Sequence, residues 1–359
     1  MNNTKKKYVF WICLTLLLCA VYIFFAARPF SQELTMEIQW TVDLNRSEDF
    51  VAGSEKSDDA IPFRLGNRLG YFSESGKLLL CEDFPFKATI CSTYWATFDA
   101  SSHGVTVKDV SGNEVTKIDC EGFPFFNNQR CFVFLPGGNS LCEYNTSGER
   151  KWMYENFSPI TAFQATPNDA LIGTADGNLI CLDNKGEKTA SFYPGGSDFS
   201  IILGADISSS GKFVAAISGI DKQRIILAQV KDSQPKILYH RYLAGNIRQN
   251  AFVRFASSDK MLYFATPNGL GVLDVASHRT SEIPLAGKIV DVIEIPGTEL
   301  WAVLLNQING YEVALIEDFS NMVGSFAVEA KNVFIASRSS TLYVGHDDKI
   351  SAFALKRGL

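Results

Sequence analysis

The chain has 359 residues, of which 46% are apolar and 20% charged, and its formal net charge is −6. This composition belongs to a folded protein with enough apolar residues for one large or two ordinary domains, so an intrinsically disordered chain is excluded. The acidic balance argues against nucleic-acid binding, for which a basic domain is expected.

The amino terminus carries the pattern of a membrane anchor. Three lysines in residues 1–7 precede residues 8–27, which contain no charged side chain. A helix of that length spans about 30 Å, the thickness of the hydrocarbon core. We predict a cytoplasmic tail over 1–7 and a transmembrane helix over 8–27, after which residues 28–359 lie across the membrane. The span is marked by Tyr8, Trp11, Leu16, Tyr22 and Ala27.

Cleavage of this segment as a signal peptide is the alternative. The apolar region is longer than the about 7–15 residues typical of signal peptides. Phe24 or Phe25 also occupies the −3 position of the possible cleavage site, where signal peptides have a small residue. Lipoprotein processing is disfavoured because Leu18, a large residue, precedes Cys19. An uncleaved signal anchor is therefore the favoured interpretation.

Beyond a tether over 28–35, the chain repeats with a period near forty. A strand with alternating polarity is predicted at 36–44, and residues 45–60 form a polar loop. The segment CEDFPF at 81–86 returns as CEGFPF at 120–125, and turn glycines follow one another 36, 36 and 38 residues apart. These glycines are Gly76, Gly112, Gly148 and Gly186. Repeats of this length made of short strands are typical of propeller blades.

The repeats predict an all-β domain over 36–359. Residues 171–192 contain three strands joined by two tight turns, which is most of one blade. Eight blades result if strand 36–44 completes a last blade that has only three strands of its own, since closure leaves no free sheet edge. Seven blades are the alternative, because the first blade is poorly marked. We place the blades at about 50–83, 84–120, 121–157, 158–196, 197–243, 244–287 and 288–330, with the eighth from 331 onward.

Residues 171–192 resemble the repeat of the quinoprotein-like (PQQ-type) propellers. Residues 146–154 resemble it too, with Trp152 where that family places its docking tryptophan. The dehydrogenases of the family hold a quinone and calcium beside a vicinal disulfide, and this chain has no vicinal cysteine pair. The resemblance therefore implies the branch of non-enzymatic scaffolds, which includes an eight-bladed lipoprotein of the bacterial outer-membrane assembly machinery.

We identify no catalytic, cofactor-binding or metal-binding residues from the sequence, and we expect no enzyme. The chain lacks the serine-hydrolase, metalloprotease, P-loop and dinucleotide motifs. Its four histidines fall in four different blades and are interpreted as solvated or locally bonded: His103, His240, His278 and His346. Cysteines recur at equivalent repeat positions, which favours core side chains, and one cross-strand disulfide between Cys131 and Cys142 is worth testing.

Phenylalanines recur at the blade junctions, where they either pack between blades or anchor a partner. They are Phe84, Phe86, Phe123, Phe125, Phe126 and Phe157. Together with the anchor they favour a single-pass protein of the cytoplasmic membrane whose propeller, on the periplasmic or extracellular side, is a scaffold for unidentified protein partners in envelope assembly. The alternative function is an enzyme or sensor with a small-molecule or metal site in the central channel.

Overall fold

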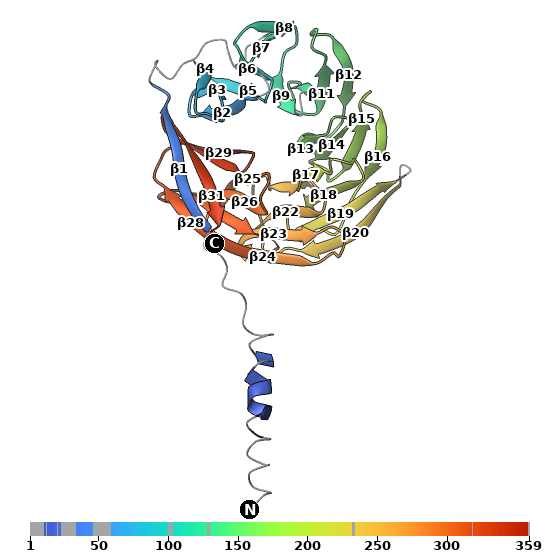
Figure 1. Ribbon diagram of the computed structural model, residues 1–359. Coiled ribbons are helices and arrows are strands. Elements are labelled where there is room, and N and C mark those ends of the chain that lie inside the picture. The colour runs from blue at the N-terminus through green and yellow to red at the C-terminus, as the bar shows by residue number, and fades with distance from the viewer. Residues whose placement is uncertain are drawn as a thin grey trace, which may run out of the picture. The chain divides into compact units, whose positions relative to one another are not determined.

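The computed structural model in Figure 1 describes residues 11, 13–19, 21–22, 34–45, 59–99, 103–127, 130–231, 234–317 and 319–357. The chain divides into two compact units, one of Met1–Glu37 with Leu355–Leu359 and the other of Ile38–Ala354. Each unit is considered by itself.

The first unit holds helical residues of the predicted span. Residues 13–19 and 21–22 are helical, and Trp11, Leu16 and Tyr22 are exposed. Tyr8, Ala27, the tail over 1–7 and the tether over 28–33 lie outside the described residues. Among the residues that are described, no helix reaches the length and apolarity that crossing a membrane requires.

The strands form eight antiparallel sheets, here called blades one to eight (Figure 1). Blade one is β2 Ile61–Leu65, β3 Arg68–Phe72 and β4 Leu78–Asp83; blade two is β5 Lys87–Ile90, β6 Tyr94–Phe98, β7 Val105–Asp109 and β8 Glu114–Ile118; blade three is β9 Phe123–Asn127, β10 Arg130–Phe134, β11 Ser140–Tyr144 and β12 Arg150–Glu155; blade four is β13 Ile160–Ala165, β14 Asp169–Thr174, β15 Leu179–Asp183 and β16 Lys188–Phe192.

The second half repeats the same plan. Blade five is β17 Ile202–Ile207, β18 Phe213–Ser218, β19 Arg224–Lys231 and β20 Gln234–Tyr242; blade six is β21 Val253–Phe255, β22 Met261–Thr266, β23 Gly269–Asp274 and β24 Thr280–Pro284; blade seven is β25 Lys288–Glu294, β26 Leu300–Gln307, β27 Gly310–Glu317 and β28 Asn321–Val328; blade eight is β29 Val333–Arg338, β30 Thr341–His346, β31 Lys349–Arg357 and β1 Leu34–Asp43.

The eight-bladed propeller is confirmed, and the seven-bladed alternative is wrong. All seven boundaries between predicted blades fall in the connections between observed sheets, for example the boundary at 157/158 between β12 and β13. Blade one has three described strands, and the predicted polar loop before it lies largely outside the described residues.

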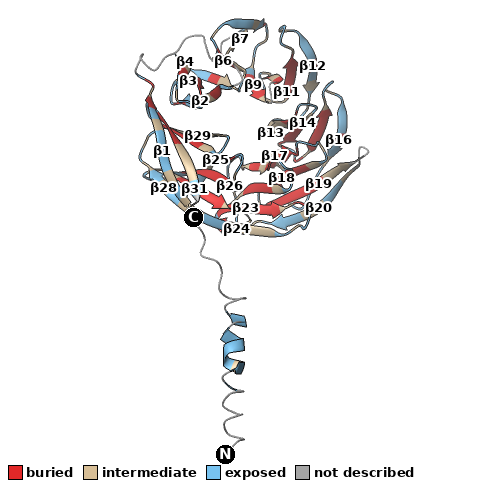
Figure 2. Cartoon of the chain, in the orientation of Figure 1, coloured by how far each residue is buried: buried red, intermediate tan, exposed pale blue. Residues whose placement is uncertain are grey.

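Burial explains why these segments are strands. The second and third strands of a blade are covered on both faces by the neighbouring blades, so β14 and β15 are almost continuously buried. The outermost strand β16 is mostly exposed, with Ala190 as its one buried residue, because only one of its faces meets the next blade. Figure 2 shows this gradient of burial from the middle strands to the outer strands.

A tryptophan on an outer strand covers the turn glycine of the next blade in two places, and one of these contacts lies where the ring closes. A Cβ atom on Gly186 would lie 2.6 Å from the Trp152 ring, and one on Gly76 would lie 2.7 Å from the Trp40 ring. Both glycines have positive φ, at 78° and 86°, which L-residues rarely adopt. Trp40 lies on β1, which pairs with β31, so blade eight meets blade one as blade three meets blade four.

Candidate functional site

The antiparallel strand order divides the loops of the unit Ile38–Ala354 into two sets on opposite sides. We call "connection face" the side with the blade-to-blade connections and the turns between second and third strands, such as 156–159 and 175–178. We call "turn face" the side with the other turns, such as 166–168 and 184–187. Hydrogen bonds within each side agree with this division, since Asp176 N donates to Ser158 Oγ at 3.0 Å.

The exposed large apolar side chains of the loops all lie on the connection face, within the part of the chain that the structure describes. Phe157 and Ile308 are fully exposed, and the others are at least half exposed. These residues, named here the apolar loop set, are Phe86, Phe157, Tyr193, Phe199, Ile220 and Ile308. The remaining exposed large apolar residues of the propeller unit lie on strands, so the asymmetry between the two loop sides marks the connection face as the candidate site.

Hydrogen bonds hold the loop of residues 193–201, which carries Tyr193 and Phe199, in place. The Tyr193 hydroxyl donates to Asp176 Oδ2 at 3.2 Å, and Ile220 N donates to the Phe199 carbonyl at 3.2 Å. Although burial opposes it, hydrogen bonds from Thr174 and Tyr193 lower the pKa of Asp176. The carboxylate is therefore ionised at neutral pH and fixes Tyr193, so a partner would meet an ordered surface.

The predicted phenylalanines divide between packing and exposure. Phe84 and Phe126 are buried, whereas Phe86 and Phe157 are exposed on the connection face. The other two, Phe123 and Phe125, are partly exposed on β9. Sequence reasoning did not single out Tyr193, Phe199, Ile220 or Ile308, although their places between consecutive strand patterns were a usable signal.

Polar side chains of five consecutive inner strands form a second feature, a belt of hydrogen bonds between blades. Asn127 donates to Gln164, Gln164 bonds to Asp206, and Asp206 Oδ2 accepts from Phe255 N at 2.6 Å. Arg254 lies on the same inner strand as Phe255, and its guanidinium pairs with the Asp291 carboxylate of the following inner strand at 3.1 Å. These groups come from several blades, as a channel site requires, but they bond to one another and thereby join the blades.

The described residues contain no group of three or more His, Cys, Asp or Glu side chains placed to hold a metal ion. Of the histidines, His103 pairs with Glu121 at 2.7 Å on the connection face, with both side chains exposed.

Asp206 is the belt residue with the strongest electrostatic perturbation. Burial raises its pKa to about 6, against hydrogen bonds from the N–H groups of Phe255 and Ile207 that favour the charged form. A carboxyl with a raised pKa stabilises the fold while it is protonated. Its contribution is complete below the ordinary value of 3.8 and is lost as the pH rises through about 6.

We expect Asp206→Asn to remove this pH dependence. Between pH 4 and 7 the free energy of unfolding of the variant, relative to the unsubstituted protein, should rise by roughly 2 kcal/mol. Denaturant unfolding at several pH values measures this difference, with Asp119→Asn as an exposed control. A constant difference across the range would contradict the assignment.

The predicted cysteine pair lies in blade three on adjacent strands. Both Cys131 and Cys142 are free thiols, and the register pairs Cys131 with Tyr144 and Val133 with Cys142, so the two cysteines are not directly opposite. Burial raises the pKa of Cys131 to about 12, which keeps that thiol protonated and weakly nucleophilic. The disulfide stays a prediction.

Comparison with known proteins gives three findings. A family model described as "beta-propeller protein" matches residues 1–358. A protein of Treponema pallidum (strain Nichols) with the name "Uncharacterized protein" is 28% identical over 350 residues, which cover 96% of this chain and 93% of that protein. The crystal structure of BamB from Moraxella catarrhalis superposes with a TM-score of 0.61 at 11% identity, over 89% of this chain and 100% of that one, and this likeness concerns the fold alone.

Proposed function

The chain belongs to the beta-propeller protein family, and from this premise we propose that it is a membrane-anchored scaffold that binds protein partners through its connection face. Envelope assembly is the setting favoured by the resemblance of its repeat to the scaffold branch of the PQQ-type propellers. Catalysis forms no part of the proposal.

The apolar loop set is the observation that carries the proposal. Aromatic and branched apolar side chains dominate the binding energy of protein interfaces, and a rigid surface loses little entropy when it binds. Phe157 is fully exposed in the connection between blades three and four, and Tyr193 and Phe199 follow in the next connection. The turn face offers no such group among the described residues.

The amino-terminal segment supports the anchoring part of the proposal. Residues 8–27 are uncharged and follow three lysines, which favours a single pass with the propeller on the periplasmic or extracellular side. The propeller has no need of a basic surface to stay at the membrane under this arrangement, in keeping with its acidic composition.

A photo-reactive phenylalanine analogue at position 157 tests the function. In intact cells we expect ultraviolet light to produce discrete crosslinked protein adducts in the membrane fraction, because the side chain would lie inside the interface. The adducts should fall at least fivefold when Phe199→Asp is added in the neighbouring connection.

The matched control places the same analogue at Ile237, which is exposed on the outer strand β20. Equal adducts from positions 157 and 237 would refute the connection face as the binding surface. Recovery of the unprocessed chain from the soluble cytoplasmic fraction would refute the anchor and leave the interface to be judged by the crosslinks.

A further inference from the structure

A cleft of about 620 Å³ opens between blades six and seven on the turn face. Its walls come from the turns after β21, β23, β25 and β27, the four turns that these two blades contribute to that side. The volume lies within the range of about 300–1,000 Å³ common for ligand pockets. The connection face and its apolar loop set lie on the other side of the ring.

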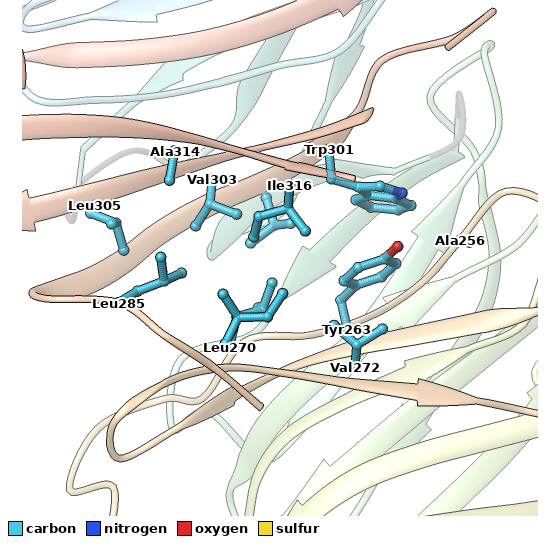
Figure 3. Packing of buried hydrophobic residues seen from close by; sticks show 12 residues of the cluster. Ala256, Tyr263, Leu270, Val272, Leu285, Trp301, Val303, Leu305, Ala314 and Ile316 are labelled. Carbon is cyan, nitrogen blue, oxygen red and sulfur yellow. The ribbon is translucent and has the colours of Figure 1, made fainter. Parts of the chain in front are cut away.

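Two stacked aromatic rings line the cleft on the side of the apolar core between the blades. The rings of Tyr263 and Trp301 are 3.9 Å apart between centroids with an interplanar angle of 28°, and Figure 3 shows them facing each other across the blade interface. Both side chains are buried and pack against Val272 and Val303 of the cluster between the blades. Met261 and Phe319 add apolar surface nearby. The inner part of the cleft is thus apolar and held by the core.

Charged side chains of both signs line the opening. Lys260 and Arg279 are basic, and Asp274, Glu294 and Glu299 are acidic. The guanidinium of Arg279 lies 5.6 Å from the centre of the Phe319 ring, which restricts it to one wall. Acidic and basic side chains thus occur together at the opening, and Asp274 and Arg279 lie at the two ends of the same turn, between β23 and β24.

Two of the acids are fixed by backbone hydrogen bonds. Asp274 Oδ1 accepts from Ser277 N at 2.8 Å, and Glu294 Oε2 accepts from Ser257 N at 3.0 Å. The hydrogen bond from Ser277 lowers the pKa of Asp274, so this wall keeps its negative charge. Lys260 and Glu299 are exposed at the mouth, where a bound group could reach them.

We propose that this cleft binds a short peptide segment in which an apolar side chain is flanked by one acidic and one basic residue. The apolar side chain enters between Met261, Phe319 and the stacked pair. The flanking charges meet the acidic and basic side chains at the opening, so both signs there are complemented. This goes beyond the proposed function, because it assigns a second binding surface on the opposite side of the propeller.

Blocked five-residue peptides provide the test, with the full-length chain labelled with 5-fluorotryptophan. The probes hold a central leucine flanked by lysine and glutamate in either order, by two glutamines, by two lysines or by two glutamates. The fluorine resonance of Trp301 is assigned by its loss in Trp301→Phe. We expect at least one mixed-charge peptide to shift this resonance and to bind at least tenfold tighter than the glutamine, dilysine and diglutamate peptides.

Charge reversal then distinguishes binding in the cleft from nonspecific attraction between the peptide and the charged surface. Lys260→Glu should weaken binding of the mixed-charge peptide at least tenfold. Lys212 is an exposed lysine in a turn of blade five on the same side, and Lys212→Glu should change the affinity less than twofold. The proposal is overturned if no peptide moves the Trp301 resonance, if the flanking charges make no difference, or if the two reversals act alike. Phe157→Asp should leave peptide binding unchanged, so failure here is distinct from failure of the connection face.

Discussion

Replacing Glu143 by alanine is expected to lower the free energy of unfolding by about 3–5 kcal/mol. The Glu143 side chain is only 2% exposed and lies between Arg130, which donates to its carboxylate, and Lys151, whose Nζ is 2.7 Å from Oε1. Arg130 also donates to the carbonyls of Thr166 and Asp169 in blade four, at 2.8 Å each. Truncation would leave a buried guanidinium without its counter-ion at the junction of two blades.

Chemical denaturation of the variant measures this loss, with Glu155→Ala on the exposed end of β12 as the control. Although burial opposes it, hydrogen bonds from Arg130 and Lys151 lower the pKa of Glu143. The stabilisation should therefore be present above its ordinary pKa and disappear as the pH falls through the lowered value. A loss below about 1 kcal/mol at pH 7 would mean that the network is not formed as described.

Trp40→Ala should cost about 2–3 kcal/mol, less than the loss of a fully buried tryptophan because this indole is partly exposed, and should weaken the closure of the ring. The indole covers Gly76 and donates from Nε1 to the Glu74 carbonyl at 3.1 Å. Its ring centroid lies 5.8 Å from that of Tyr343, in a tilted arrangement, and 6.1 Å from that of Phe72, edge to face. It therefore joins the strand that starts the propeller to blades eight and one. Alanine removes the ring and leaves a cavity over the turn glycine.

Hydrogen exchange should locate this effect. We expect protection to fall first in β1 and β31, because they lose the contact that closes the ring. Ile38→Ala on the same strand is the control, since that side chain is exposed. Uniform loss of protection across all eight blades would contradict a closure made by this contact.

The repeat and the blade boundaries were readable from the sequence because they depend on local chemistry, whereas the choice of eight blades over seven was decided by the structure. Turn glycines such as Gly186 adopt a positive φ, and short apolar strands lie between them, so each repeat marks its own position in the sequence. The strand at 36–44 was predicted as the closing strand because the last repeat is one strand short. Its observed partner is β31, from the far end of the chain.

The candidate sites depended on contacts that no single repeat contains. Phe84 and Phe86 are two residues apart in one sequence echo, yet the first is buried and the second exposed, because the neighbouring blade covers only one of them. Likewise, Glu143 lies in an ordinary strand pattern, and its counter-ions are brought to it by adjacent strands. The cleft with Tyr263 and Trp301 arises where two blades stack. The sequence by itself thus determined the repeat and the ring, since these follow from short-range geometry. Tertiary packing between blades decided which side chains are exposed, which charges pair and where the cleft lies.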